Sequence, residues 1–250
     1  MYKKIIKKII GLFGFKPIDK DLFKKNRILS EKSILNINTI LKNLFSKKTI
    51  NSLVQIGAND GLRFDTINYF IKHYKTDCLL VEPIKENYES LKENYKNFDF
   101  IKFENSAITV NNEINYLYKV NPNKVSNYGN HIPGITSFDK DHLIKHGVKK
   151  YDIIKESIES ISIKDLLLKH NFTHLDLLFI DTEGYDGHIV IDFLSTTSSR
   201  PIIIFEYIHI NNGIFKTLID TIQEKNYIFF SINENMFCFP REKKKLIDIS

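Results

Sequence analysis

Short apolar runs alternate along this chain with segments in which apolar residues recur at helical spacing. The runs cover residues 52–56, 78–81, 98–103, 175–180 and 202–205. The run 175–180 is almost continuously apolar, as expected of a strand that is covered on both faces of a parallel sheet. Repeated strand-helix-strand units build a parallel sheet with right-handed crossovers. The pattern therefore predicts an α/β fold with a mostly parallel sheet.

Two further strand-like runs follow near the end of the chain, at residues 227–232 and 236–239. The short polar segment Asn233-Glu234-Asn235 joins them, which is typical of a β-hairpin. Together with the five earlier runs they predict a seven-stranded sheet with a C-terminal antiparallel hairpin.

Between the third and fourth runs the sequence is less regular. Residues 114–120 predict a further strand, which we expect to pair with the end of the third. Residues 121–150 contain scattered proline and glycine and predict a long loop. Long loops inside compact domains are more often functional than idle, so we expect a lid or an acceptor-binding wall here.

The chain is predicted to have one main domain, residues 49–240, between an N-terminal helical extension, residues 1–48, and a basic tail, residues 241–250. Within the extension, segment 2–13 places lysines on one side of a helical wheel and apolar residues on the other. This suits peripheral contact with an anionic membrane, and a short helix that caps the domain is the alternative. No apolar run reaches the roughly 20 residues that a membrane helix needs, so we expect a cytoplasmic protein, at most peripheral at the membrane.

The charge distribution bears on the expected binding partners, and the cysteine content bears on the expected state of the thiols. The net charge of +6 comes largely from lysine clusters at the two termini, which lack the aromatic interleaving of nucleic-acid-binding segments. We therefore expect no nucleic-acid partner. Cys78 and Cys238 each lie within an apolar run, which predicts buried free thiols.

The first run ends in a turn with two glycines, Gly57 and Gly61, and a helical segment follows. Glycine lets a ligand approach the backbone, and a helix N-terminus offers free N–H groups. Glu82, about 20 residues further on at the end of the second run, can accept both hydroxyls of a ribose. The turn lacks the middle glycine of a dinucleotide motif and the Gly-Lys-Ser/Thr of a phosphate-binding loop. By elimination it favours S-adenosylmethionine.

Polar residues follow five of the predicted strands, at 57–61, 82, 105–107, 181–186 and 206–209. In an open parallel sheet these strand ends lie at one edge, where ligands bind. The sequence therefore predicts a single site built from all five clusters.

Three segments resemble the signature segments of FkbM-type methyltransferases: Ile56 to Gly61, Glu82-Pro83, and Leu177 to Asp186. The similarity extends from Leu53 to Phe239 in order and spacing. It implies a class I, Rossmann-like methyltransferase fold with S-adenosylmethionine as the methyl donor. It also implies a small-molecule or glycan acceptor, most often a hydroxyl on a saccharide, a glycoconjugate or a related small molecule.

The resemblance also implies where the donor is bound. It assigns the methionine part to Gly57, Ala58, Asn59 and Gly61, the ribose to Glu82, and the adenine to Ser106 and Ala107. Many relatives carry an acid at the position of Gln55. An amide can still accept a hydrogen bond from the donor ammonium but adds no full charge, which Asp60 could supply instead.

The reaction itself is predicted at Asp181 and Glu183. Methyl transfer is an in-line displacement, so the protein must hold the acceptor oxygen near the methyl carbon and help to remove its proton. A carboxylate here could do so directly, or Asp181 and Glu206 could hold a divalent cation that lowers the pKa of the hydroxyl. His209 is a further candidate base, because an ordinary histidine titrates near pH 6.5. Helix capping and backbone hydrogen bonds are the structural alternatives.

The sequence thus predicts an S-adenosylmethionine-dependent O-methyltransferase. An N-methyltransferase acting on an amino sugar or small molecule remains open, as does a non-catalytic nucleoside-binding scaffold with the same fold. Gln55 and the cationic N-terminus favour the scaffold, whereas Glu82, Asp181 and Glu183 argue against it. The sequence does not indicate the oligomeric state.

Overall fold

The computed structural model describes residues 36–247 of the 250-residue chain, apart from residues 64, 113, 130, 131 and 173. The chain divides into two compact units, residues 1–40 and 41–250. The amphipathic segment 2–13 predicted from the sequence lies outside the described residues. Within the described part, no helix is both long enough and apolar enough to cross a membrane.

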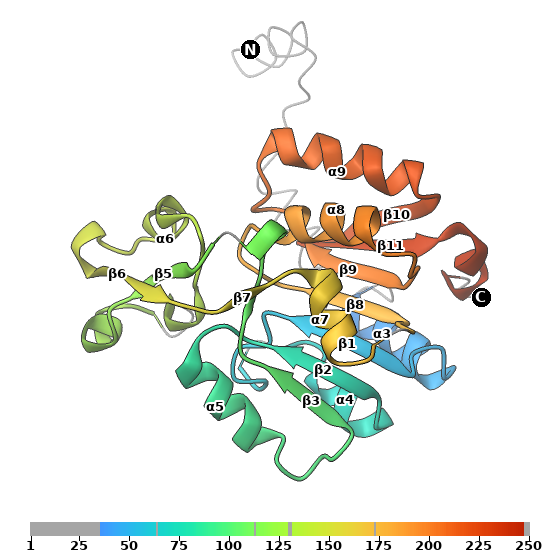
Figure 1. Cartoon of the computed structure of the whole chain (residues 1–250), viewed down its shortest axis with the longest axis horizontal. Coiled ribbons are helices and arrows are strands. Elements are labelled where there is room, and N and C mark those ends of the chain that lie inside the picture. The colour runs from blue at the N-terminus through green and yellow to red at the C-terminus, as the bar shows by residue number, and fades with distance from the viewer. Residues whose placement is uncertain (1–35, 64, 113, 130–131, 173, 248–250) are drawn as a thin grey trace, which may run out of the picture. The chain divides into compact units, whose positions relative to one another are not determined.

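A seven-stranded sheet forms the centre of the second unit (Figure 1). In spatial order its strands are β10 (Tyr227–Ile232), β11 (Asn235–Pro240), β9 (Ile202–Glu206), β8 (Leu177–Ile180), β1 (Ser52–Ile56), β2 (Asp77–Val81) and β3 (Ile101–Glu104). Neighbours from β9 to β3 pair in parallel. Strand β11 is antiparallel to both β9 and β10. The predicted α/β fold, with a mostly parallel seven-stranded sheet and a C-terminal antiparallel hairpin, is confirmed.

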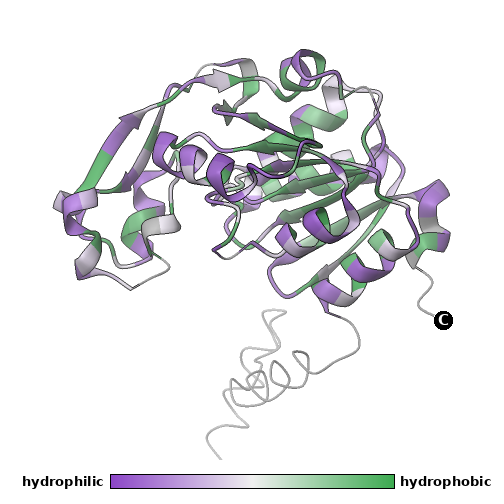
Figure 2. Ribbon diagram, turned by 90° about the horizontal axis from the view of Figure 1, so that it is seen from below, coloured by the Kyte–Doolittle hydropathy of each residue, from purple (hydrophilic) through white to green (hydrophobic). Residues whose placement is uncertain are grey.

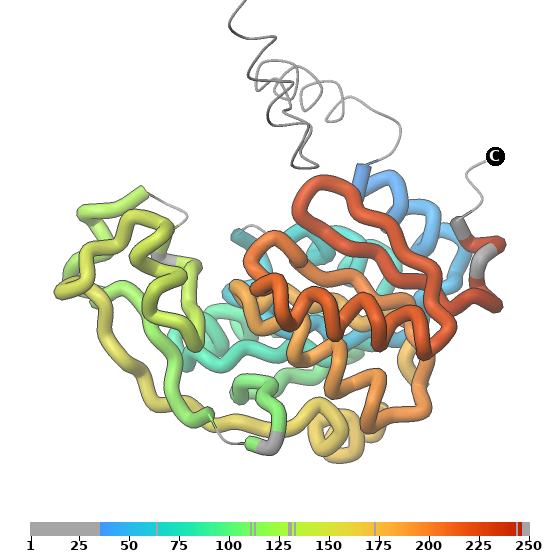
Figure 3. Tube along the Cα trace, turned by 90° about the horizontal axis from the view of Figure 1, so that it is seen from above, coloured from blue at the N-terminus to red at the C-terminus, as the bar shows by residue number. Residues whose placement is uncertain are grey.

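Helices cover both faces of this sheet. They are α3 (Ile37–Ser46), α4 (Asn68–Tyr74), α5 (Lys85–Asn94), α7 (Ile163–Lys169), α8 (Asp186–Thr196) and α9 (Asn212–Glu224). Helices α7, α8 and α9 lie on one face, and α4 lies with residues 41–46 of α3 on the other (Figures 1 and 3). Every side chain of β8 is consequently buried, as the continuous apolar run predicts.

The hydrophobic core lies on both sides of the sheet, and Figure 2 shows the hydrophobic residues gathered in its strands. On the α8 side, Phe193 packs with Val54 and Leu178 in one large cluster. On the α4 side, Phe45 stacks on Phe70 with ring centroids 5.4 Å apart. Cys78 in β2 and Cys238 in β11 are buried free thiols, as predicted.

Between β3 and β8 the chain leaves the sheet. Its elements there are β4 (Ala107–Ile108), η1 (Val110–Asn112), β5 (Tyr116–Val120), η2 (Pro122–Asn127), η3 (Ile132–Gly134), α6 (Lys140–Lys145), η4 (Lys150–Asp152), β6 (Ile153–Ser157) and β7 (Ser160–Ile161). Residues 116–157 are called the insertion below, and they lie beside the seven-stranded sheet in Figures 1 and 3.

The insertion corrects two expectations from the sequence. Strand β5 pairs antiparallel with β6, not with the end of β3, because the chain after β3 first turns away to pair β4 with β7. Residues 121–150 are not a long irregular loop. They hold α6, which buries Leu143 in a small core of its own. At the other end of the chain, the first part of the predicted basic tail forms η5 (Arg241–Ile247).

Candidate functional site

The carboxyl ends of β1, β2 and β8 meet at one edge of the sheet through direct backbone contacts. Asp181 N donates to the carbonyl of Ile56 at 3.0 Å, and Gly57 N donates to that of Val81 at 3.0 Å. Gly57 has φ +83°, and a Cβ at this position would lie 1.8 Å from the carbonyl oxygen of Asp181. Only glycine combines this backbone conformation with this approach.

A cavity of about 520 Å³ opens at this edge, within the usual size of small-molecule sites, about 300–1,000 Å³. Its lining brings together most of the residues predicted from the sequence: Gln55, Gly57, Ala58, Asn59, Glu82, Ser106, Ala107, Asp181, Glu183, Glu206 and His209. The insertion contributes Leu117, Gly134, Ile135, Thr136, Phe138 and His146. The five strand-end clusters and part of the insertion therefore form one site.

Gly61, the other glycine of the turn, is not among the residues that line this cavity. Its φ is +70°, and a Cβ here would lie 2.5 Å from Cε2 of Tyr95 and 2.6 Å from Cδ1 of Leu91. The structure therefore favours glycine at position 61 for packing against Tyr95 and Leu91, a reason that is independent of the donor contact that the resemblance implies.

Glu82 is buried and ties the glycine turn to the end of β2. Its Oε2 accepts from the backbone N–H of Asn59 and its Oε1 from that of Ile84, both at 2.9 Å. Burial raises the pKa of Glu82 to about 7, although these N–H donors favour the charged form. Because a carboxylate oxygen has two lone pairs, Oε2 keeps the capacity to accept from a ligand hydroxyl.

Gln55 is buried at the cavity and has one satisfied and one unsatisfied end. Its Nε2 donates to Oδ2 of Asp65 at 3.2 Å, whereas its Oε1 has no hydrogen-bond partner among the described residues. A buried acceptor without a partner is uncommon in folded proteins. Gln55 Oε1 is thus a buried acceptor beside the cavity whose hydrogen-bonding capacity is unused.

Asp65 lines the cavity, although the sequence did not single it out. Its Oδ1 accepts from the backbone N–H groups of Ile67 and Asn68, at 2.8 and 3.0 Å, and burial raises its pKa. An aspartate just before a helix is most simply explained as a helix cap. The sequence therefore gives no reason to expect Asp65 beside Gln55. Asp60, which the sequence offered as the compensating charge, is not a lining residue and instead pairs with Arg63.

Several carboxyl groups crowd the end of β8. The side chain of Asp181 has accessible surface, but that surface faces the cavity. The protein atoms of the cavity walls lie around it and reduce its hydration. This desolvation, with the charges of Asp186 and Glu183, raises the pKa of Asp181 to about 8. Desolvation and the charges of Asp181 and Glu183 likewise raise the pKa of Glu206 to about 9. Desolvation and mutual repulsion thus favour the protonated, neutral form of both carboxyl groups near neutral pH.

The turn after β8 is shaped by Asp186 and Glu183. The buried Oδ2 of Asp186 accepts from Oγ1 of Thr182 at 2.7 Å, and burial raises the pKa of Asp186 to about 6. Glu183 has φ +53°, which is uncommon for a residue other than glycine. Its carbonyl accepts from Oγ of Ser137 at 3.1 Å, so the turn is joined to the insertion.

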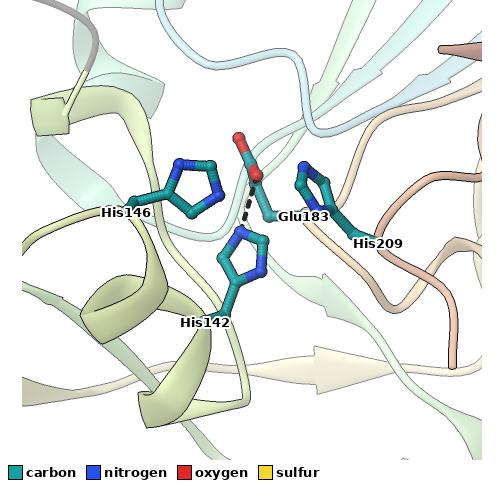
Figure 4. Close-up of side chains that lie close together, drawn as sticks. All are labelled: His142, His146, Glu183 and His209. Atoms are coloured by element: carbon teal, nitrogen blue, oxygen red, sulfur yellow. Dashed lines mark hydrogen bonds and ion pairs between the residues drawn. The ribbon is translucent and has the colours of Figure 1, made fainter. Parts of the chain in front are cut away.

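Four side chains from three separate segments meet at the wall of the cavity (Figure 4). His142 lies in α6 and His146 directly follows that helix, whereas Glu183 follows β8 and His209 follows β9. His142 Nε2 is 2.9 Å from Glu183 Oε2. One possible ligand atom from each residue lies within 4.8 Å of the other three. Burial and the nearby His142 lower the pKa of His209.

Half of this cluster was missed by the sequence analysis. Glu183 and His209 were expected in the site, but His142 and His146 were not. The available signal was their spacing of four residues, which places two imidazoles on one side of a helical turn and recurs among zinc ligands. The cation pair suggested from the sequence, Asp181 and Glu206, is not part of the cluster.

Comparison with known proteins gives a family match and several similar folds. The Methyltransferase FkbM domain family matches residues 55–229. An O-methyltransferase from Bacillus cereus in complex with SAH is 9% identical with a TM-score of 0.45, over 94% of this chain and 97% of that one. A methyltransferase from Geobacter sulfurreducens is 10% identical, with a TM-score of 0.40 and 94% of both chains covered. Methyltransferase FkbM from Methylobacillus flagellatus KT is 11% identical with a TM-score of 0.44, over 76% of this chain and 44% of that one. No curated protein sequence matches the chain.

Proposed function

The chain belongs to the FkbM-domain methyltransferase family, and on this premise we propose that it methylates a hydroxyl oxygen, with S-adenosylmethionine as the donor. The acceptor that we propose is a saccharide, a glycoconjugate or a related small molecule. One observation carries the proposal: a single cavity joins the donor turn at Gly57 and the ribose candidate Glu82 with the carboxylate of Asp181.

The carboxyl groups of the cavity support a cationic donor, because a bound cation would relieve the repulsion between them. S-Adenosylmethionine carries a positive sulfonium and an ammonium group, and Asp65, Asp181 and Glu206 place carboxyl groups in the lining. The unpartnered Oε1 of Gln55 is an acceptor suited to the ammonium group. Leaving such a buried acceptor unpaired costs about 1–3 kcal/mol, so a ligand N–H that reached it would gain a corresponding advantage.

The chemistry that the bound donor supplies is an electrophilic methyl carbon. Asp181, at the end of β8, is placed to orient the acceptor hydroxyl and to take its proton as the new C–O bond would form and the bond from the methyl carbon to sulfur would break, leaving S-adenosylhomocysteine. Ile135 and Phe138 of the insertion add apolar side chains to the same cavity, which would limit the water around the reacting atoms. Proximity and proton removal are the two contributions that this site makes to the transfer.

The remaining lining supports a polyhydroxylated acceptor. Thr136, Glu206 and Asn235 line the cavity with a hydroxyl, a carboxyl and an amide group. Together these groups can both donate hydrogen bonds to a sugar and accept them from it. A saccharide acceptor uses this polar lining, whereas a purely apolar acceptor would leave it unpaired.

Calorimetry with S-adenosylmethionine and S-adenosylhomocysteine tests the donor assignment. We expect saturable binding by the full chain, and a weakening of at least about tenfold in Glu82→Ala, which removes hydrogen bonds to a charged acceptor. Glu89→Ala is the matched control, because Glu89 is an exposed glutamate of α5 that pairs only with Lys92 among the described contacts. Absence of binding heat from folded protein at millimolar ligand would refute the proposal.

Transfer of a labelled methyl group to a panel of saccharides tests the acceptor. Mass spectrometry of the product then distinguishes a methoxy group from an N-methyl group. A product methylated only on nitrogen would replace the hydroxyl acceptor by an amine.

A further inference from the structure

We propose that His142, His146, Glu183 and His209 bind one divalent cation of the Zn²⁺ class, which fastens α6 to the ends of β8 and β9. This site is separate from the donor-binding residues, and cation binding as such does not depend on the proposed methyl transfer.

The first support is convergence from segments far apart in the sequence. The ring of His142 lies 4.6 Å, centroid to centroid, from the rings of both His146 and His209, and the latter two are 5.3 Å apart. The carboxylate of Glu183 lies among these rings, as Figure 4 shows. Three imidazoles and one carboxylate thus face a common centre.

The kinds of ligand atom decide which cation fits. Three imidazole nitrogens and one carboxylate oxygen are ligands typical of Zn²⁺ and of related first-row divalent metals. Mg²⁺ and Ca²⁺ prefer shells made of oxygen, which this cluster does not offer. The pair His142 and His146 also has a ligand spacing that zinc sites use.

Distances in the cluster are close to those that a bound ion requires. Tetrahedral Zn²⁺ with bonds of about 2.0–2.1 Å holds its ligand atoms about 3.4 Å apart. The ligand atoms here lie within 4.8 Å of one another, and His142 Nε2 lies 2.9 Å from Glu183 Oε2. Small side-chain rotations therefore complete the shell. A hydrogen bond connects only two of these four atoms, whereas a metal cation would contact all four.

The surroundings favour a retained ion. The side chain of His142 is 8% exposed, and those of Glu183 and His209 are 26% and 23% exposed, so the cluster is largely shielded from water. Glu206 Oε2 lies 3.8 Å from His209 Nε2, so a second carboxyl group stands beside the cluster. Partial dehydration and nearby carboxyl oxygens both strengthen the binding of a divalent cation.

The position of the cluster indicates what the ion does. Four protein ligands close a tetrahedral shell and leave no place for a substrate, which is the arrangement of structural zinc sites. Helix α6 has only 6 residues and depends on tertiary contacts for its stability. The ion would hold this helix, and with it the insertion residues 134–138, against the cavity. The effect on the acceptor-binding wall rests on the proposed function.

The test uses the full chain without an affinity tag, freed of metal by a chelator. Isothermal titration with Zn²⁺ is expected to show one ion per chain, and Co²⁺ is expected to give the intense visible absorption of a four-coordinate ion. Loss of an outer partner of a metal ligand already weakens binding about 10–100-fold, so we expect at least a 100-fold loss in each of His142→Gln, His146→Gln and His209→Gln.

His174→Gln is the matched control, since His174 is 83% exposed and lies outside the cluster. Its Zn²⁺ affinity is expected to equal that of the unaltered protein. Circular dichroism shows which variants are folded, and the Co²⁺ spectrum of the unaltered chain decides the matter if none of them is. Hydrogen exchange at residues 140–146 should slow when Zn²⁺ is added.

Three outcomes overturn the proposal: no Zn²⁺ binding by the unaltered chain, equal binding by the folded cluster variants, or an equal loss in His174→Gln. Because these titrations contain no methyl donor, their failure leaves the donor calorimetry unaffected. Conversely, a protein that binds Zn²⁺ but not S-adenosylhomocysteine would retain the metal site and lose the proposed function.

Discussion

A Cβ at Gly57 would lie 1.8 Å from the carbonyl oxygen of Asp181, so the donor turn and the carboxylate proposed for the reaction meet through their backbones. The backbone N–H of Asp181 also donates a hydrogen bond to the carbonyl of Ile56. Backbone contacts of this kind fix the position of a reacting group more firmly than a flexible side chain can. The separation between the glycine turn and the backbone of Asp181 is therefore set by the sheet itself.

Gly57→Ala should destabilise the fold by more than about 3 kcal/mol, because the methyl group meets the backbone of β8 in addition to the strain of a positive φ. Gly147→Ala is the matched control. Gly147 has φ +88°, but no heavy atom lies within 4 Å of the place that its new methyl group would take, so only about 1–2 kcal/mol of strain is expected. Urea unfolding of both variants measures the difference, and equal losses would contradict the role of close approach.

Donor binding should strengthen as pH rises through the pKa of Glu82, which burial places at about 7. Only the deprotonated carboxylate accepts a hydrogen bond from each ribose hydroxyl. The dissociation constant for S-adenosylhomocysteine should therefore fall between pH 6 and pH 8, with a slope approaching tenfold per unit on the acid side. Calorimetry across this range is the measurement. Glu82→Gln should bind more weakly and with no such slope.

The stability of the ligand-free protein should depend on pH through the same group. Glu82 has an ordinary pKa of 4.5 and a folded-state pKa of about 7, so between these values the folded state holds a proton that the unfolded state releases. Its favourable contribution is complete below pH 4.5 and is lost as pH rises through 7, in total about 3 kcal/mol. Unfolding free energies of Glu82→Gln and the unaltered protein should diverge in favour of the variant from pH 5 to pH 8. A constant difference would show that the pKa is not raised.

The strands and the donor turn could be predicted from the sequence because their signals are local. The apolar run that becomes β8 needs only its own residues to indicate a buried strand. Glu82 and Asp181 were placed in one site because the carboxyl ends of parallel strands share an edge.

The rest of the site depends on contacts between distant segments. His142 meets Glu183 across 41 residues, and nothing local to α6 shows that this helix lies against the end of β8. Gly61 illustrates the reverse case: its motif suggests a ligand, whereas its packing against Tyr95 is visible only in three dimensions. Asp65 accepts two local backbone hydrogen bonds, as a helix cap does, and these are what its sequence position predicts. Its contact with Gln55 is seen only in the structure.

Asp181→Asn should abolish most turnover while leaving donor affinity within a few-fold of the unaltered value. Asparagine keeps the size of the side chain and the backbone bond to Ile56, but it can no longer take the proton of the acceptor hydroxyl. Loss of a general base typically costs about 10²–10⁴ in kcat. Single-turnover methyl transfer and donor calorimetry on the same sample separate the two effects. Full activity would assign Asp181 a structural role.

Gln55→Glu should lower the free energy of unfolding unless Asp65 is also substituted. In the structure Gln55 Nε2 donates to Asp65 Oδ2 at 3.2 Å, so a glutamate would replace this bond by two facing carboxylates in a buried place. We expect a loss of about 1–3 kcal/mol from the unpaired buried acceptors alone. Asp65→Asn in the same chain restores a donor, since the amide of asparagine can face the new carboxylate.

The double variant Gln55→Glu/Asp65→Asn keeps the total charge of the pair and moves it to the residue whose Oε1 lacks a partner. Because the donor ammonium would then meet a full charge, we expect affinity for S-adenosylhomocysteine to rise severalfold above that of the unaltered protein. Unfolding free energies of both single variants and the double variant form a cycle that isolates the coupling between positions 55 and 65. Additive losses would show that the two side chains act independently, and an unchanged affinity would place the ammonium elsewhere in the cavity.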